Sequence, residues 1–174
     1  MWGMARQALA SRVARIMGRV LGRTGRQKGA PSPGQPRLAA YPGDFTGIPK
    51  ISYEPNPGNG KVADPGEIVW AWVPFEEDHS QGKDRPVLVI GRDGPLLLAL
   101  PLTSKDHERD AVQEAAVGRH WADIGSGTWD HLGRASEVRV DRILRLDPAG
   151  VRRQGAVLDE GRFSQVAAAV RAAR

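Results

Sequence analysis

Cysteine is absent from this chain of 174 residues. Its absence excludes disulfide bonds, thiolate metal ligands and cysteine nucleophiles, and it fits a reducing compartment. Long apolar runs are missing as well, because none approaches the roughly 20 residues needed to cross a bilayer. We therefore expect a cytoplasmic protein whose chemistry uses hydroxyl, carboxylate, imidazole or guanidinium groups.

Acidic residues are absent from residues 1–43, which hold eight of the 25 basic side chains. The rest of the chain has 17 basic residues against all 20 acidic ones, so the isoelectric point of about 10.1 reflects the N-terminal region. Net charge thus gives no reason to regard the remainder as a general nucleic-acid binder. Any RNA contact there requires a local basic patch.

The N-terminal region divides into two segments. Residues 1–28 include, at 5–27, apolar and arginine side chains on opposite faces at helical spacing, which predicts a basic amphipathic helix. Such a helix would lie on an anionic membrane, contact RNA phosphates or bind an acidic partner; the alternative is a disordered extension without a role. Residues 29–63 are rich in proline and glycine and predict a linker that contributes no packed core.

Residues 64–174 are expected to form one mainly β domain with a C-terminal helix. Short apolar segments predict strands at 67–73, 86–90, 96–100, 120–124 and 137–143. After them, Asp159 is expected to cap a helix whose apolar stripe consists of Phe163, Val166, Ala167 and Val170. Short strands in so few residues favour a small closed barrel, because closure removes exposed edges.

Four segments of the chain occur in an order that is characteristic of one protein family. They are PGEIVWAWVPFEED (65–78), HSQGKDRPVLVIG (79–91), LALPLTSK (98–105) and SEVRVDRILRLD (136–147). In this order they resemble the MazF/PemK toxins of type II toxin–antitoxin systems, and the likeness covers about 110 residues. The resemblance implies an SH3-like barrel, a homodimer with single-stranded RNA bound between the protomers, and an antitoxin that occupies the same groove. It also implies an endoribonuclease that needs no metal.

Metal-free RNA cleavage needs a base for the ribose 2′-OH, a cation beside the phosphorane and an acid for the departing 5′-oxygen. Arg85 is the first candidate for the cation, because it precedes Pro86 at the start of an apolar strand and matches the family's Arg-Pro motif. Thr103 matches the family's catalytic or phosphate-binding threonine and can donate a hydrogen bond to a phosphate. The alternatives are an ion pair for Arg85 and a local backbone hydrogen bond for Thr103.

A second catalytic set matches the PemK/Kid branch and consists of His79, Arg139 and Asp141. Arg139 and Asp141 are two residues apart on a predicted strand, so we expect both to point to the same face. The alternatives are an exposed loop for His79 and a surface ion pair for the other two. Further RNA contacts are expected from the loop and strand ends around these positions, namely Ser80, Gln81, Gly82, Lys83, Pro86, Ser104 and Lys105.

Two residues depart from the family pattern. Asp84 adjoins Arg85, where an acid would repel phosphate, and Arg142 stands where the family commonly has glutamine. These departures keep open a catalytically degenerate barrel that binds a peptide or nucleic acid, or an inhibitor of a DNA enzyme. His107, His120 and His131 lack metal-ligand spacing, so we predict neither a metal nor another cofactor. Trp121 and Trp129 have the aromatic surface to stack on bases, but positions in the core or at a dimer interface are the stronger expectation.

Overall fold

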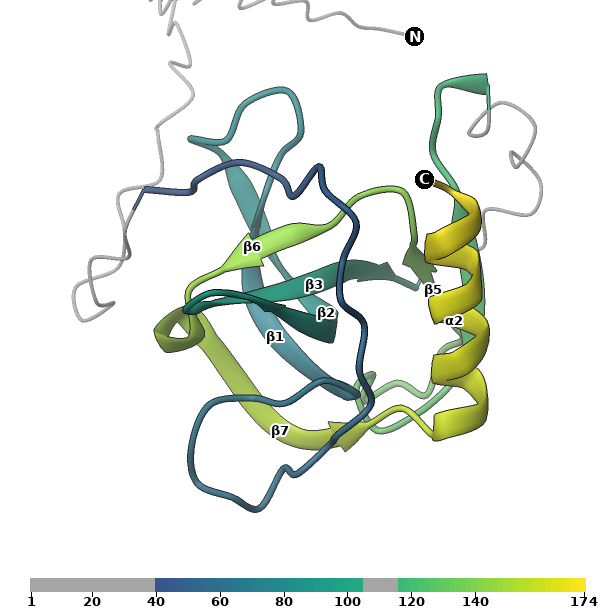
Figure 1. Cartoon of the computed structure of the whole chain (residues 1–174). Helices are drawn as coiled ribbons and strands as arrows, with labels where there is room; N and C mark the ends of the chain where they lie inside the picture. The colour runs from purple at the N-terminus through teal and green to yellow at the C-terminus, as the bar shows by residue number, and fades with distance from the viewer. Residues whose placement is uncertain (1–39, 105–115) are drawn as a thin grey trace, which may run out of the picture. The chain divides into compact units, whose positions relative to one another are not determined.

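The structure is a computed structural model that describes residues 40–104 and 116–174. These residues form an antiparallel sheet followed by one C-terminal helix, which confirms the predicted fold class (Figure 1). The predicted helix at 5–27 and Lys105 lie outside the described residues. The strands are β1 (Glu67–Pro74), β2 (Gly82–Asp93), β3 (Leu96–Thr103), β4 (Trp121–Gly125), β5 (Ser136–Arg139), β6 (Leu144–Leu146) and β7 (Val151–Val157). The 3-10 helix η2 (Pro148–Gly150) precedes β7, and the helix α2 is Glu160–Ala172.

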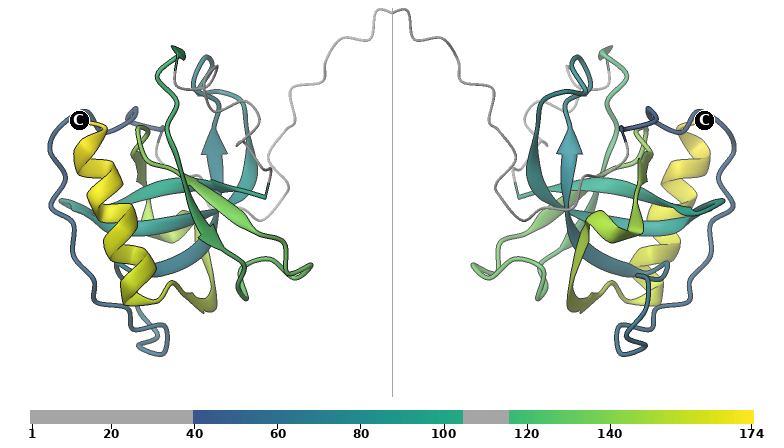
Figure 2. Two further views of the ribbon diagram at one scale, coloured as in Figure 1. Left: turned by 90° about the vertical axis from the view of Figure 1, so that its right-hand side faces the viewer. Right: turned by 90° about the vertical axis from the view of Figure 1, so that its left-hand side faces the viewer.

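The described strands do not close into a barrel, so the predicted closure is wrong. Hydrogen bonding runs in the order β4-β5-β3-β2-β1-β7, with β6 paired to β3, and the path ends at β4 and β7 (Figure 2). The preceding chain forms hydrogen bonds with the domain at two points away from β4 and β7. Phe45 N donates to Ile143 O at 2.8 Å, and Ser52 N donates to Ile90 O at 3.1 Å.

Both faces of the central strands are buried. Along β2, Leu88 and Ile90 lie in a core that α2 covers, whereas Val87 and Val89 lie in a second core with β6 on the opposite face. The uninterrupted apolar runs of β2 and β3 follow from this arrangement, since a strand buried on both faces has no polar alternation. Burying each such side chain contributes about 1.5–3 kcal/mol.

Part of the predicted linker lies against this domain. The side chains of Phe45, Ile51 and Tyr53 contact the main core, which is at odds with a segment that contributes no packed core. Gly91 makes the approach possible, because a Cβ atom at this position would lie 2.4 Å from the Lys50 carbonyl oxygen. Prolines and glycines in residues 40–63 therefore shape an extended covering strip.

The C-terminal helix follows the sequence pattern closely. Asp159 accepts a hydrogen bond from Arg162 N at 3.0 Å as the N-cap, and the buried residues of α2 are Phe163, Val166, Ala167 and Val170. Neither described helix is long and apolar enough to span a bilayer. By contrast, β7 was not predicted. Its middle residues Arg152-Arg153-Gln154 are polar and only Ala156 is buried, so the strand carries little apolar periodicity.

Candidate functional site

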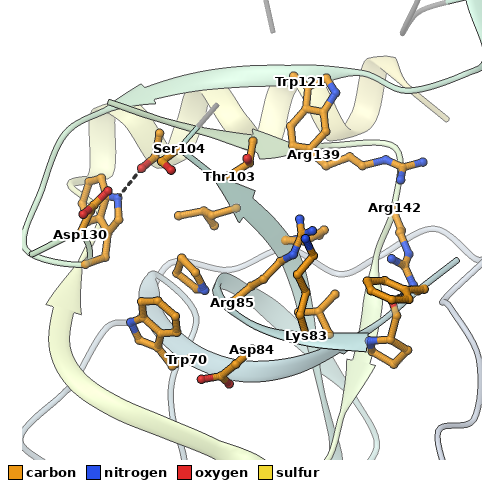
Figure 3. A pocket seen from close by; sticks show the side chains of 18 of the residues that line it. Trp70, Lys83, Asp84, Arg85, Thr103, Ser104, Trp121, Asp130, Arg139 and Arg142 are labelled. Atoms are coloured by element: carbon orange, nitrogen blue, oxygen red, sulfur yellow. Dashed lines mark hydrogen bonds between the residues drawn. The ribbon is translucent and has the colours of Figure 1, made fainter. Parts of the chain in front are cut away.

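A cavity of about 440 Å³ opens where β2 and β3 separate (Figure 3). The pairing of these strands ends at Val87–Pro101, and the next residues of β3 pair with β5 instead. Pro101 has no N–H to donate, so it cannot extend a ladder in both directions. The divergence leaves Arg85 on one wall and Thr103 on the other, and both line the cavity.

Arg85 is a half-buried cation of the cavity without a counter-charge among the described residues. Its side chain has neither a hydrogen bond nor an ion pair in that part of the chain. Burial lowers the pKa of the Arg85 guanidinium, and the positive charge of Arg142 lowers it further. An unpaired cation in a partly desolvated cavity is a favourable place for an anion.

Asp84, which adjoins Arg85 in the sequence, is paired elsewhere. Its carboxylate forms an ion pair with Arg152 of β7, which lies beyond β1 in the sheet. Successive side chains of a strand point to opposite faces, so Asp84 and Arg85 diverge from each other (Figure 3). The expected repulsion between Asp84 and a bound phosphate is therefore reduced.

Several of the predicted RNA contacts line the same cavity. Thr103 is half-buried at the end of β3, where it pairs with Glu137 of β5, and Ser104 follows it at the exposed rim. Lys83 and Pro86 reach the cavity from β2. The cavity lining contains six Lys or Arg side chains and four Asp or Glu side chains, so it is a local basic patch in an acidic domain.

Arg139 and Asp141 do come together, but as a closed ion-pair cluster. Arg139 is 8% exposed, and its guanidinium bonds to Asp141 Oδ2 and to Glu76 Oε2, each at 2.8 Å. Burial would lower the pKa of Arg139, but the hydrogen bonds that its guanidinium donates to Asp141 and Glu76 outweigh burial and raise this pKa. Asp141 also accepts from His120 N at 2.7 Å, so both of its oxygens are engaged.

The strand predicted at 137–143 ends early. β5 stops at Arg139, and a bend at Val140 and Asp141 follows before β6. The bend breaks the alternation of side chains, so Arg139 and Arg142 both line the cavity while Asp141 turns back onto Arg139. Arg142 was considered only as a departure from the family pattern. Its burial beside Arg85 depends on this bend, which no periodicity in the sequence signals.

His79 lies away from the other predicted catalytic residues. Its ring contacts Tyr41 edge-on with 4.9 Å between ring centroids, and it lines a separate cavity of about 300 Å³. The loop around it folds on Asp78, which accepts from Ser80 N at 2.9 Å and from Gln81 Nε2 at 2.7 Å. Neither Ser80 nor Gln81 lines the larger cavity.

Gly82 has a structural reason to be glycine. A Cβ atom there would lie 2.4 Å from the Val73 carbonyl oxygen of β1. The glycine therefore allows β1 and β2 to approach at the start of their hairpin. Gly82 itself does not line the larger cavity.

Tryptophan side chains form much of the remaining wall. Trp129 is 3% exposed and donates to Ser136 Oγ at 3.0 Å, as expected of a core residue, while Trp121 is half-buried. Trp70 was not predicted as a cavity residue. Its buried indole Nε1 has no hydrogen-bond acceptor within residues 40–104 and 116–174.

Besides Lys83 and Arg85, two titratable side chains of the cavity lack hydrogen bonds and ion pairs among the described residues: Glu77 and His131. Neither was predicted for this site, since His131 was considered only for its metal-ligand spacing. Within residues 40–104 and 116–174, no cluster of three or more His, Asp or Glu side chains has the geometry to hold a metal ion.

The fold and the cavity define a small β protein with a basic, partly buried cavity. A family model of the PemK-like, MazF-like toxins of type II toxin–antitoxin systems matches residues 64–173. The chain belongs to this family, and the match confirms the resemblance seen in the sequence.

Comparisons with individual proteins add the following. No curated protein matches the sequence. Among solved structures, MazF (Form-I) from Deinococcus radiodurans is 22% identical with a TM-score of 0.46, covering 64% of this chain and 96% of that chain. The MazE–MazF structure (Form-II) from the same organism is 22% identical with a TM-score of 0.45, covering 64% and 95%.

Proposed function

We propose that this protein is the toxin of a type II toxin–antitoxin system and cuts single-stranded RNA without a metal. The observation that carries the proposal is Arg85, a half-buried cation without a partner among the described residues, across a cavity from Thr103. A guanidinium placed in this way can hold two phosphate oxygens and stabilise the charge that develops in the transition state. Membership of the toxin family supports the same assignment.

In the proposed reaction the ribose 2′-oxygen attacks the adjacent phosphorus. The O2′–P bond forms while the P–O5′ bond breaks, which leaves a 2′,3′-cyclic phosphate and a 5′-OH end. Arg85 stabilises the phosphorane, and Thr103 donates a hydrogen bond to a phosphate oxygen.

His131 is our candidate for the base that takes the 2′-OH proton. Glu76 and Asp130, two carboxylates of the cavity, are engaged by arginines, whereas His131 has no hydrogen bond or ion pair among the described residues and an imidazole nitrogen can accept a proton. The departing 5′-oxygen then takes a proton from water. The set of His79, Arg139 and Asp141 is less favourable, because His79 lines another cavity and Asp141 is occupied by Arg139.

The decisive experiment incubates the purified full chain with mixed single-stranded RNA in EDTA and maps new 5′-OH and 2′,3′-cyclic phosphate ends. We expect site-selective cuts, and a fall of about 10²–10³-fold in rate for Arg85→Ala. Arg171→Ala removes the same charge from the exposed side of α2 and is the matched control. RNA that stays intact at high protein concentration would overturn the proposal.

A second candidate is a binding module without catalysis. Three arginines of the cavity (Arg134, Arg139 and Arg142) are already paired with carboxylates, which leaves few free cations. For this candidate the same experiment shows RNA binding without new ends. A cognate antitoxin and a homodimer belong to the toxin proposal. Co-expression with a neighbouring small acidic reading frame and light scattering test them respectively.

A further inference from the structure

Arg142 is a buried cation that depends on a residue outside the family-matched region. Its side chain is 8% exposed, and its Nε donates to Asp44 Oδ2 at 2.8 Å. The Nη2 group donates to the Pro74 carbonyl oxygen at 2.9 Å and to Asp44 Oδ1 at 3.3 Å. The Arg142 guanidinium is therefore fixed at the wall of the larger cavity by the Asp44 carboxylate and by the Pro74 carbonyl oxygen.

Asp44 is itself held firmly in place. Tyr41 donates its hydroxyl hydrogen to Asp44, and the next residue, Phe45, bonds through its N–H to Ile143 O at 2.8 Å. Burial acts to raise the pKa of Asp44, but the hydrogen bonds from Arg142 and Tyr41 outweigh it and lower this pKa. The carboxylate thus stays charged. Residues 41–45 all precede the family match, which begins at residue 64.

The electrostatic consequence concerns Arg85. Arg142 is close enough to depress the pKa of Arg85 through repulsion between the two positive charges. Without a counter-charge, two guanidiniums would face each other in a partly desolvated cavity, where charges interact more strongly than in water. Asp44 supplies that counter-charge from the side of Arg142 that bonds to the protein.

We propose that Asp44 is a positioning residue that fixes Arg142 and offsets its charge, so that Arg85 remains the free, half-buried cation for the RNA phosphate. The strip formed by residues 40–46 is then a functional part of the site. This inference rests on the proposed ribonuclease function, but its electrostatic part is measurable with an oligonucleotide that the protein cannot cut.

The experiment compares the wild-type full chain with Asp44→Asn, Asp44→Glu and Asp93→Asn. Asp93 Oδ2 lies 3.8 Å from Arg145 Nη1, and Asp93 does not line the larger cavity. Asp93→Asn is therefore a matched control for the loss of one negative charge. Binding of a single-stranded 2′-O-methyl RNA is followed by fluorescence anisotropy from low to high salt. Cleavage of the ordinary RNA gives kcat and KM separately.

For Asp44→Asn we expect tighter binding at low salt, by roughly 3–10-fold, and a logarithmic salt slope steeper by about 0.7, because one more cation meets phosphate. We expect kcat to fall about 10-fold, since Arg142 is no longer fixed. Asp44→Glu retains the charge and should keep the wild-type salt slope. A role confined to folding would lower stability and leave the salt slope unchanged.

An unchanged salt slope in Asp44→Asn, or an equal change in Asp93→Asn, would overturn the inference. Wild-type protein that binds but never cuts, together with a steeper slope in Asp44→Asn, would reject the nuclease and keep the role of Asp44. If Asp44→Asn does not fold, Tyr41→Phe replaces it, because it weakens the hold on Asp44 and retains the charge. For this variant we expect kcat to fall 2–3-fold, and an unchanged kcat would count against the inference.

Discussion

The two cavities of the domain share one hairpin but differ in chemistry. The larger one, about 440 Å³, receives Arg85 from β2 and is lined by charged and tryptophan side chains. The smaller one, about 300 Å³, receives His79 from the preceding loop and is lined mostly by apolar groups, with Trp72 49% exposed. Arg85 follows His79 by only six positions, yet the loop folds on Asp78 so that the two side chains enter different cavities. Proximity in the sequence therefore does not make a common site.

Replacing one histidine in each cavity should distinguish most clearly which cavity takes part in RNA cleavage. For His131→Ala, in the larger cavity, we expect kcat to fall about 10²-fold, because the 2′-OH loses its proton acceptor. The shape of the pH–rate profile should change, because a group that takes part in proton transfer is lost. Single-turnover RNA cleavage measured against pH tests this, with His120→Ala as a control outside the cavity. A profile that keeps its shape would exclude His131 as the base.

The arginine clusters of the larger cavity are expected to act on stability as well. Arg139→Ala leaves Asp141 partly buried without its partner, and we expect a loss of about 2–3 kcal/mol in the free energy of unfolding. The figure is at the low end because Glu76, the other partner, is 45% exposed and regains water. Urea denaturation gives the value. A loss below about 0.5 kcal/mol would mean that the cluster contributes no more than an ordinary surface ion pair.

Acid should weaken the larger cavity through Asp130. The hydrogen bond from Arg134 holds the pKa of Asp130 below its ordinary range, despite burial. The ionised carboxylate therefore stabilises the fold above the ordinary carboxyl pKa, and this contribution is lost as the pH falls through the lowered value. We expect Asp130→Asn to cost about 1 kcal/mol at pH 7 and progressively less as the pH falls below the ordinary carboxyl range, as measured by urea denaturation at each pH. A difference that persists unchanged in acid would contradict this assignment.

The smallest effect is expected in the smaller cavity. His79→Ala removes an edge contact with Tyr41 and should change kcat/KM less than about twofold, with roughly 0.5–1 kcal/mol lost in stability. RNA cleavage assayed beside His131→Ala provides the direct contrast. A loss of 10-fold or more would reverse the comparison and restore His79 to the catalytic set.

Much of the fold was predictable because its signals are local. The N-cap Asp159, the apolar stripe of α2 and the doubly buried runs of β2 and β3 follow from spacing and propensity alone. Edge strand β7 and the bend after Arg139 were not predictable, since they depend on pairing with β1 and on the ion pairs that Arg139 and Arg142 form with distant carboxylates. The candidate site divides in the same way. Arg85 and Thr103 carry motif signals, whereas Asp44, Trp70 and His131 reach the site only through long-range contacts.

Composition and local motifs are enough to assign the family and the mainly β class, and to separate a basic N-terminal region from an acidic domain. These properties depend on composition and on residues close together in the chain. Which charges neutralise one another depends on the tertiary structure, because the paired residues are distant in the sequence. Asp84 turns to Arg152 and Asp44 reaches Arg142 across 98 positions, while Arg85 remains without a partner among the described residues. Ion pairing depends on distances of a few ångströms between atoms, and the folded backbone sets those distances.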